Sequence, residues 1–257
     1  MNFDDLDHDM RAFETAADVS VPEGAHMVAR IDGRGFTRLT KEIHRFDAPF
    51  DVRFRDLMVE TTRHLMDCGF RVLYGYTQSD EISLLFHPDE TCFGRKLRKY
   101  DSILAGEASA QFSVLLGARG AFDCRISQLP TDQRVVDYFR WRSEDARRNA
   151  LNAHCYWALR SDGLGARAAT ARIEGLSVEA KRGLLESLRG LGFEDLPLWQ
   201  RRGIGLEHET YEKEAKDPRT GERVTARRRR IEVQLELPEG DAYGRHVGAI
   251  LAAADRS

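Results

Sequence analysis

The chain lacks most of the features that mark secreted, zinc-binding or membrane proteins. Its four cysteines, Cys68, Cys92, Cys124 and Cys155, are far apart in the 257 residues and form no CxxC or Cys/His cluster. This spacing argues against a zinc site and a disulfide framework, and indicates reduced, mostly buried thiols. No apolar run approaches the roughly 20 residues that cross a bilayer. The N-terminus, MNFDDLDHDM, is acidic, unlike a secretory signal. We therefore expect a cytoplasmic protein without a membrane partner.

The chain also lacks an overall positive charge. Its formal net charge is −3, with 42% apolar and 32% charged residues, which is typical of a soluble globular protein. Basic residues nevertheless cluster at Arg147-Arg148, at Arg201-Arg202 and from Arg227 to Arg230. Because salt confines an electric field to roughly 8–10 Å, such a local patch can hold phosphates on a mildly acidic protein. Net charge therefore leaves nucleic-acid binding open.

The hydrophobic pattern of the first part of the chain predicts the element order β-α-β-β-α-β. Alternating or short apolar runs predict strands, and 3.6-residue periodicity predicts helices. The strands are expected at 26–32, 72–76, 82–86 and 121–127, and the helices at 51–67 and 93–117. This is the order of a split βαβ, ferredoxin-like sheet, the core of polymerase and cyclase palm domains. We therefore expect an α+β fold.

The second part of the chain has a different pattern. A helix is expected from 132 to about 160 and another at 177–189, joined by a Gly- and Ala-rich connection at 161–171. Alternating runs at 204–206 and 231–237 flank a polar stretch with a turn signal at 217–221, which indicates a long β-hairpin whose tip projects into solvent. We expect a palm-like catalytic core at 1–135. Residues 136–257 should form a helical and hairpin part packed on it rather than a clearly separate domain.

Three carboxylates lie where the predicted strands end. Asp32 precedes a glycine turn, and Asp80 and Glu81 lie in the turn of the predicted hairpin. The first strand and this hairpin are neighbours in a split βαβ sheet, so the carboxylates can converge at one edge. Two Mg²⁺ ions roughly 3.5–4 Å apart need such a cluster for phosphoryl transfer. Asp is also common in turns, and the pattern leaves both interpretations open.

Other residues could hold a nucleotide. Gly33-Arg34-Gly35 could let the backbone approach a triphosphate, although G-x-G alone is a weak motif. Lys96 and Lys99 lie at the start of a predicted helix, where backbone N–H groups favour anions, but they could equally form a solvated first turn.

Aromatic and arginine residues leave two further choices open. Phe36, Tyr74 and Tyr76 could stack on a base, although aromatic residues in strands usually belong to the core. The run from Arg227 to Arg230 could bind RNA or could be a solvated part of a strand. His154-Cys155 does not predict a nucleophile and base, because adjacent helical residues point in different directions.

Two stretches resemble signature motifs of the tRNA(His) guanylyltransferase family and its bacterial and archaeal relatives. Residues 28–36, VARIDGRGF, resemble the RIDGRxF motif, and residues 76–83, YTQSDEIS, resemble the YxQSDExS hairpin. Shorter matches follow at 93–99, 122–125 and 138–142. The resemblance covers about residues 12–210, and the two motifs in this order and spacing are highly specific.

The resemblance implies roles for individual residues. Asp32 and Asp80 should bind two Mg²⁺ ions, with the Gly33 carbonyl completing the set and Glu81 supporting them. The segment that lines the nucleotide pocket should comprise Asp32, Gly33, Arg34, Gly35, Phe36 and Thr37, together with Ser79 and Asp80. Lys96 and Lys99 match positions that hold the triphosphate, and Arg125 matches a basic position of the FDxR motif.

The resemblance also implies a reaction that runs opposite to ordinary polymerisation. The 3′-hydroxyl of an incoming nucleotide would attack an activated 5′-phosphate of tRNA, with ATP or GTP as substrates. The family assembles into oligomers, so a homo-oligomer, a dimer or tetramer, is expected.

Some positions depart from the family pattern. The stretch that aligns with HINNLYNT in eukaryotic members reads RRNALNAH at 147–154, which places Arg147, Arg148 and Asn149 where RNA-end contacts are expected. A family histidine is Thr37 here, and a family lysine is Ala48. These departures favour a template-dependent polymerase that repairs 5′-truncated tRNA over a dedicated tRNA(His) guanylyltransferase. The remaining alternatives are another palm enzyme, such as a cyclase or forward polymerase, and a non-catalytic RNA-binding palm.

Overall fold

The fold is built on one antiparallel sheet. The computed structural model describes residues 2–216, 219 and 221–254. Within them, six strands pair in the order β4-β1-β3-β2-β5-β6. They are β1 (His26–Gly33), β2 (Val72–Gln78), β3 (Glu81–Phe86), β4 (Phe122–Leu129), β5 (Ile204–Lys216) and β6 (Arg223–Gln234). The first four strands have the 4-1-3-2 order of a ferredoxin-like sheet, which confirms the α+β, palm-type prediction.

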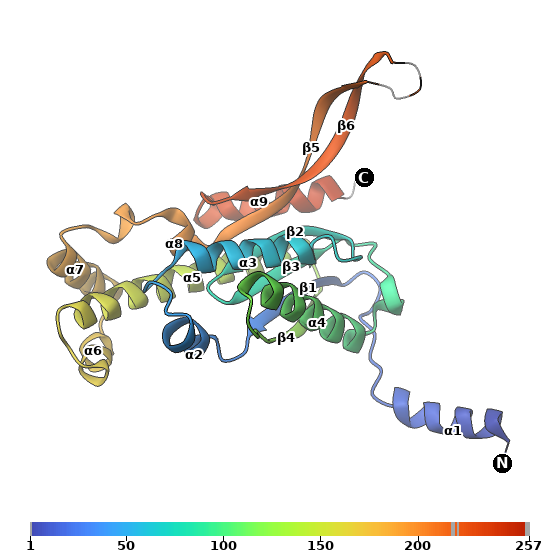
Figure 1. Cartoon of the computed structure of the whole chain (residues 1–257), viewed down its shortest axis with the longest axis horizontal. Coiled ribbons are helices and arrows are strands. Elements are labelled where there is room, and N and C mark those ends of the chain that lie inside the picture. The colour runs from blue at the N-terminus through green and yellow to red at the C-terminus, as the bar shows by residue number, and fades with distance from the viewer. Residues whose placement is uncertain (1, 217–218, 220, 255–257) are drawn as a thin grey trace.

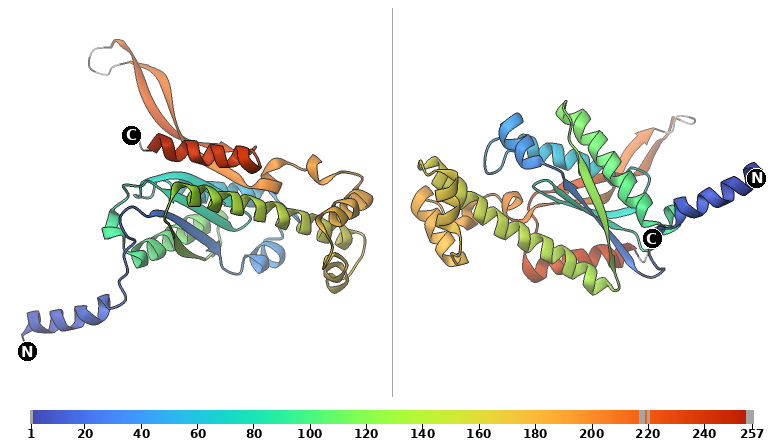
Figure 2. Two further views of the ribbon diagram at one scale, coloured as in Figure 1. Left: turned by 180° about the vertical axis from the view of Figure 1, so that it is seen from behind. Right: turned by 90° about the horizontal axis from the view of Figure 1, so that it is seen from below.

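Helices cover both faces of the sheet (Figures 1 and 2). On one face, α3 (Val52–Leu65) and α4 (Leu97–Leu116) pack Met58 and Leu104 against Ile31 of β1. On the other, α5 (Asp132–Ser161) and α9 (Gly240–Ala254) pack Phe139 and Tyr243 against Val28 of β1. Because helices cover both faces, the strand residues that point to either face are buried. Val28 and Ile31, which point to opposite faces, are each 0% exposed.

The part after residue 135 extends the same sheet. Helix α5 runs past the sheet edge and carries α6 (Ala166–Ile173) and α7 (Val178–Arg189) at its far end (Figure 1). The short helix α8 (Leu198–Arg202) returns the chain to β5, which pairs with β2 from Ile204 to Glu207. Strands from both parts of the chain therefore share one sheet.

Several elements differ from the sequence-based expectations. The connection at 161–171 contains α6, and both hairpin strands are longer than the apolar runs that predicted them, because their outer halves are polar. The predicted turn at 217–221 lies partly outside the described residues. The amphipathic α1 (Phe3–Thr15), which has no buried residue, and α9 were not predicted. The short α2 (Phe36–Arg38) continues as a π-helical turn at Leu39–Ile43.

The thiol prediction holds in its main point. All four cysteines, each of which lies within the described residues, are free. Cys155 is buried and the other three are partly buried. In the described part of the chain, each helix is too short or too polar to cross a bilayer.

Candidate active site

Asp32 and Asp80 converge at one end of the sheet. Asp32 lies in β1 opposite Glu81 of β3, and Asp80 lies in the tight turn that joins β2 to β3. The Gly33 N–H donates a hydrogen bond to the Asp80 carbonyl at 3.0 Å, which ties the end of β1 to this turn. The first strand and the hairpin are therefore neighbours, as the ferredoxin-like order requires.

Glycine at position 33 permits this close approach. A Cβ atom there would lie 2.6 Å from a ring carbon of Phe36 and 2.9 Å from the Asp80 Cβ atom. Gly35 has a φ of +73°, a left-handed conformation from which α2 begins. The Gly33-Arg34-Gly35 turn is therefore needed for packing around Asp80 as well as for reversing the chain.

The two carboxylates have different environments. Burial raises the pKa of Asp80, and the nearby negative charge of Asp32 acts in the same direction. The Ser79 hydroxyl donates to Asp80 Oδ1 at 3.0 Å. Asp32 is more open, and its Oδ2 lies 3.6 Å from Arg125 and 3.9 Å from Arg30. A desolvated carboxylate beside a second one favours a bound cation.

The donor set fits Mg²⁺ better than a softer metal. No group of three or more His, Cys, Asp or Glu side chains within the described residues could hold a metal ion by itself. Mg²⁺ takes only one or two carboxylates from a protein and completes its shell with water and phosphate oxygens. Asp32, Asp80 and the Gly33 carbonyl are therefore sufficient for metal ions that arrive with a nucleotide.

Glu81 has a different role from Asp32 and Asp80. Its two carboxylate oxygens accept hydrogen bonds from Arg30 of β1 and Arg142 of α5. The Arg142 side chain is 5% exposed and the Glu81 side chain 21%. Because both oxygens are engaged, Glu81 holds α5 against the sheet beside the β2–β3 turn. It supports the site through position rather than as a metal ligand.

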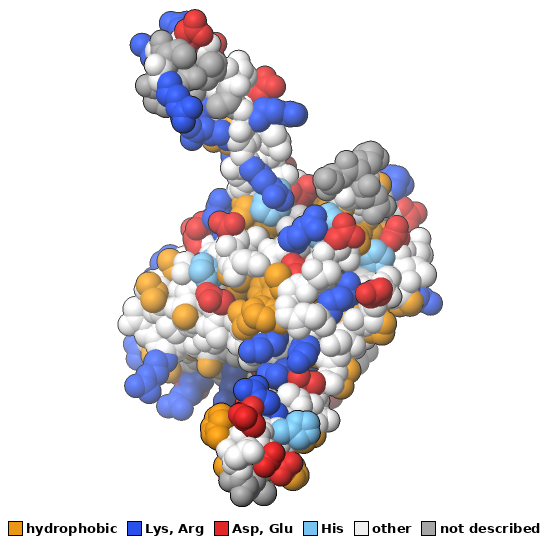
Figure 3. Space-filling view, turned by 90° about the vertical axis from the view of Figure 1, so that its right-hand side faces the viewer, with side chains coloured by type: hydrophobic (Ala, Val, Ile, Leu, Met, Phe, Trp, Pro, Cys, Tyr) orange, Lys and Arg blue, Asp and Glu red, His pale blue; other side chains and the backbone are white. Residues whose placement is uncertain are grey.

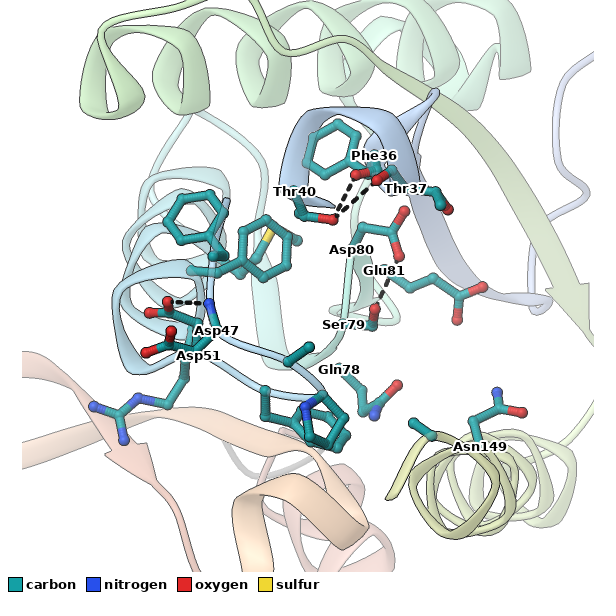
Figure 4. A pocket seen from close by; sticks show the side chains of 18 of the residues that line it. Phe36, Thr37, Thr40, Asp47, Asp51, Gln78, Ser79, Asp80, Glu81 and Asn149 are labelled. Carbon is teal, nitrogen blue, oxygen red and sulfur yellow. Dashed lines mark hydrogen bonds between the residues drawn. The ribbon is translucent and has the colours of Figure 1, made fainter. Parts of the chain in front are cut away.

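A pocket of about 340 Å³ opens beside the turn (Figure 4). Its walls come from α2, the loop before α3, α3, the β2–β3 turn and α5. Asp80 and Ser79 lie on the turn, and Asn149 of α5 lies across from it (Figure 4). The aromatic lining residues are Phe36, Phe46, Phe50, Phe54, Trp157 and Trp199. Polar and charged residues make up about half of the lining, and the rest is largely aromatic. Aromatic surface combined with polar groups is typical of a small-ligand site, and here suits a base with its phosphates.

The predicted nucleotide-binding segment lies at this pocket only in part. Phe36, Thr37, Ser79 and Asp80 line it, while Asp32, Gly33, Arg34 and Gly35 form the adjoining end of β1 and its turn. The Phe36 ring is 2% exposed and packs on Phe112 and Phe122.

Tyr74 and Tyr76 belong to the core, as is usual for aromatic residues in strands. They are 0% and 2% exposed and pack on the α5 and α9 side of the sheet.

Lys96 and Lys99 are not brought together with the carboxylates. Helix α4 begins at Leu97, and its 20 residues span about 30 Å. Its far end leads to Ala121, whose carbonyl accepts from the Arg34 N–H beside the site. Lys96 instead forms an ion pair with Asp18 at 2.8 Å. Within one copy of the chain, these lysines lie far from Asp32 and Asp80. Their contact with the triphosphate therefore stays a prediction.

The predicted RNA-contacting residues divide in the same way. Arg125 lies on β4 beside Asp32, and Asn149 lines the pocket. Arg147 of α5 forms an ion pair with Glu194 at 2.7 Å, which holds the turn before α8 against α5. Arg148 is exposed.

The structure adds two cations that the sequence analysis missed. Lys41 and Arg55 line the pocket, and their charged ends lie 5.2 Å from the Trp157 ring and 5.1 Å from the Trp199 ring. Thr37 and Lys41 are four residues apart on one helical turn, so helical periodicity after the glycine turn could have placed Lys41 on the pocket side.

Comparison with known proteins places this architecture in a family of nucleotidyltransferases. Residues 7–130 match the family model described as tRNAHis guanylyltransferase, and residues 133–239 match the one described as Thg1 C terminal domain. The chain belongs to the tRNA(His) guanylyltransferase family.

Individual relatives agree with this assignment. A bovine protein named probable tRNA(His) guanylyltransferase is 30% identical over 208 residues, which are 77% of this chain and 68% of that protein. The match to the corresponding mouse protein spans 63% of its length. A bacterial tRNA(His) guanylyltransferase-like protein in complex with GTP has a TM-score of 0.72 and 27% identity, covering 96% of this chain and 99% of that one. The enzyme of Saccharomyces cerevisiae shares the fold, with a TM-score of 0.71 and 23% identity over 77% of this chain and 91% of that one.

Proposed function

We propose that the chain is a 3′-to-5′ nucleotidyltransferase that repairs the 5′ end of tRNA by two-metal-ion phosphoryl transfer. The observation that supports this most directly is the convergence of Asp32 and Asp80 at the rim of an aromatic pocket. Similar bacterial structures contain GTP and ATP, which supports a nucleoside triphosphate as the ligand of the pocket. The family match and the named relatives argue against the cyclase, forward-polymerase and binding-module alternatives.

The chain's own residues would hold the reactants in place. Asp32, Asp80 and the Gly33 carbonyl would hold two Mg²⁺ ions, which would lower the pKa of the attacking hydroxyl and stabilise charge on the phosphates. The aromatic wall would hold the base, and Lys41 would face the phosphates. With a 5′-triphosphate end, the 3′-hydroxyl oxygen of the bound nucleotide would form a bond to the α-phosphorus of the tRNA as pyrophosphate leaves. A 5′-monophosphate end would first attack the α-phosphorus of ATP or GTP with release of pyrophosphate. The 3′-hydroxyl would then attack the tRNA's own 5′-phosphorus, and AMP or GMP would leave.

The pocket lining favours repair over dedicated addition of one G to tRNA(His). Thr37 and Ala48, two positions that depart from the family pattern, both line it. Thr37 and Ala48 therefore bring neither the imidazole nor the ammonium group that the family pattern has there. A less specialised pocket suits addition of whichever nucleotide a template strand selects.

A 5′-extension assay tests the proposal. Full-length chain, Mg²⁺ and all four NTPs are mixed with tRNA lacking its first nucleotide or with tRNA(His), each bearing a 5′-mono- or triphosphate. We expect templated addition to the truncated tRNA that disappears in Asp32→Asn and Asp80→Asn and after chelation of Mg²⁺. Asp137→Asn, a change of an exposed carboxylate on α5, is the matched control. Selective addition of one G to tRNA(His) would establish the dedicated activity instead, and a cyclic nucleotide or 3′-extended product would refute the proposal.

A further inference from the structure

A two-stranded arm leaves the body of the protein beside Val72, at the end of β2 opposite the catalytic turn. Strand β5 pairs with β2 only from Ile204 to Glu207, and beyond that its described partner is β6 alone. We call residues 208–216 and 223–231 the hairpin arm (Figure 1). At about 3.3 Å per residue the nine residues on the β5 side span about 30 Å. Ile204, the first residue of β5, lines the pocket, so the strand that carries the arm begins at the active site.

The arm is rich in exposed arginine (Figure 3). Arg227, Arg228, Arg229 and Arg230 are all exposed. Arg230 is engaged by Glu209 at 2.7 Å and Glu232 at 3.4 Å. No ion pair of the other three occurs among the described residues, so their positive charge faces solvent.

Alternation along the strands divides these arginines between the two faces of the arm. Leu206 packs in the cluster on the α3 side of the sheet, and its face continues through His208 and Thr210 to Glu212. Arg229 pairs with Thr210 and Arg227 with Glu212, so both belong to the α3 side. Arg228 and Arg230 belong to the opposite face, which continues from the α9 side.

The α3 side of the arm connects to the catalytic pocket. Phe54, Arg55 and Met58 of α3 line that pocket, and the same helix supplies Arg63 to a groove at the base of the arm. Arg229 and Arg230 also line this groove, but the Arg230 guanidinium is engaged by Glu209 and Glu232 of the opposite face. Arg229 pairs with a residue six positions beyond Ile204, which is about 20 Å along β5, and Arg227 lies about 6 Å further.

The composition of the arm fits a polyanion better than a second copy of the chain. Protein interfaces have a core that is depleted of charge and contains aromatic or aliphatic anchors. Between positions 209 and 230, Tyr211 is the single aromatic residue, and charged residues predominate. Guanidinium groups match phosphate geometry, and A-form RNA is recognised chiefly through its shape, phosphates and 2′-hydroxyls.

We propose that the α3 side of the hairpin arm, through Arg227 and Arg229, binds the phosphate backbone of the tRNA whose 5′ end lies in the pocket. This inference rests on the proposed function. Glu60 and Asp67 also line the groove at the base of the arm and repel phosphate. Arg229 is the outermost arm residue of the groove, two positions beyond Ile231, so the RNA contacts the arm from Arg229 outward, away from these two carboxylates. Such contacts carry no sequence information, which suits an enzyme that acts on more than one tRNA.

The test compares two variants that remove equal charge from opposite faces. Arg227→Ala/Arg229→Ala changes the α3 side, and Arg228→Ala/Arg230→Ala is the matched control. The dissociation constant for 5′-truncated tRNA is measured by filter binding over a series of salt concentrations. For the α3-side variant we expect a roughly tenfold weaker affinity and a salt slope reduced by about 1.5, from two lost phosphate contacts. For the control we expect less than a threefold change and an unaltered slope.

A second substrate separates this inference from the proposed function. An acceptor-stem hairpin that is too short to reach the arm should be extended at its 5′ end equally by the wild-type protein and both variants. If tRNA binding depends on Arg227 and Arg229 of the hairpin arm but no RNA is extended at its 5′ end, the inference stands and the proposed function is refuted. Equal weakening by both variants, or no weakening by either, would overturn the inference. A loss of oligomer mass in light scattering confined to the α3-side variant would also overturn it, in favour of a contact between copies.

Discussion

Replacing Glu81 by Gln separates a positioning role from a metal-binding role. The Glu81 carboxylate lies between two guanidinium groups, those of Arg30 and Arg142. Glutamine keeps the shape of the side chain but removes its charge. Its NH₂ group would replace one of the two oxygens and would face an arginine, which also donates, so that hydrogen bond would be lost. Arg142 would then remain buried with only Asp145, 3.3 Å away, as a charged partner.

The structure sets the size of the effect. Breaking a buried ion pair by removing one partner costs about 3–5 kcal/mol, because the other charge remains desolvated. Asp145 offsets part of this cost, and the Glu81 side chain is 21% exposed, so we expect a loss near the lower end, about 3 kcal/mol. For a chain of 257 residues this corresponds to a fall in Tm of about 6–10 °C. The double variant Glu81→Gln/Arg142→Met should be less destabilised than the sum of the single changes.

The assay combines thermal unfolding with a Mg²⁺ titration of 5′ addition at a temperature where the variant is folded. Glu81→Gln should lower Tm and leave the Mg²⁺ concentration for half-maximal rate unchanged, whereas Asp80→Asn should raise that concentration or abolish activity. A Tm within 1–2 °C of wild type together with an increased Mg²⁺ requirement, judged against the expected fall of about 6–10 °C, would refute the positioning role and make Glu81 a metal ligand.

Three further predictions concern the turn, the loop before α3 and the pocket. Gly33→Ala should destabilise the protein by about 1–3 kcal/mol and impair 5′ addition, because its Cβ would lie 2.6 Å from a ring carbon. Gly106→Ala on α4, where no atom lies within 4 Å, should be neutral or stabilising, and urea unfolding compares the two. The Arg53 side chain, aided by backbone N–H donors, lowers the pKa of Asp51 to about 2. Asp51 should therefore contribute about 2 kcal/mol above pH 4 that is lost between about pH 4 and 2, so the stability gap between wild type and Asp51→Ala should narrow over that interval. Lys41→Ala should raise the KM for NTP roughly threefold to tenfold with little change in kcat, and an unchanged KM would exclude Lys41 from phosphate binding.

Local patterns predicted most of the catalytic sheet. Apolar alternation around Ile31 and the short runs at 72–76 and 82–86 determine strands directly, since each residue's side depends only on its position in the strand. The convergence of Asp32 and Asp80 followed from the order of elements, because a split βαβ sheet makes β1 and β3 neighbours. The resemblance to family motifs then selected metal binding from the alternatives that the residue pattern left open.

Long-range geometry separates Lys96 from the carboxylates within one copy of the chain, and its triphosphate role stays a prediction. A motif match assigns a role without a position, and the length of α4 places this residue at the opposite end of the sheet from Asp80. Lys41 was missed for the converse reason. Its place in the pocket depends on α2 folding back over the β2–β3 turn, which brings together residues that no local pattern connects.

The sequence by itself determined the element order of the catalytic sheet, the two carboxylates at strand ends and the glycine turn beside them, because these depend on local periodicity and backbone freedom. Tertiary structure alone decided that Glu81 is held by Arg30 and Arg142, that Lys41 faces a ligand pocket, and which face of the hairpin arm each arginine occupies. Those properties depend on contacts between residues far apart in the sequence, such as Glu81 and Arg142, which are 61 positions apart. Burial and electrostatic interactions depend on the distance between residues in space and not on their separation along the chain.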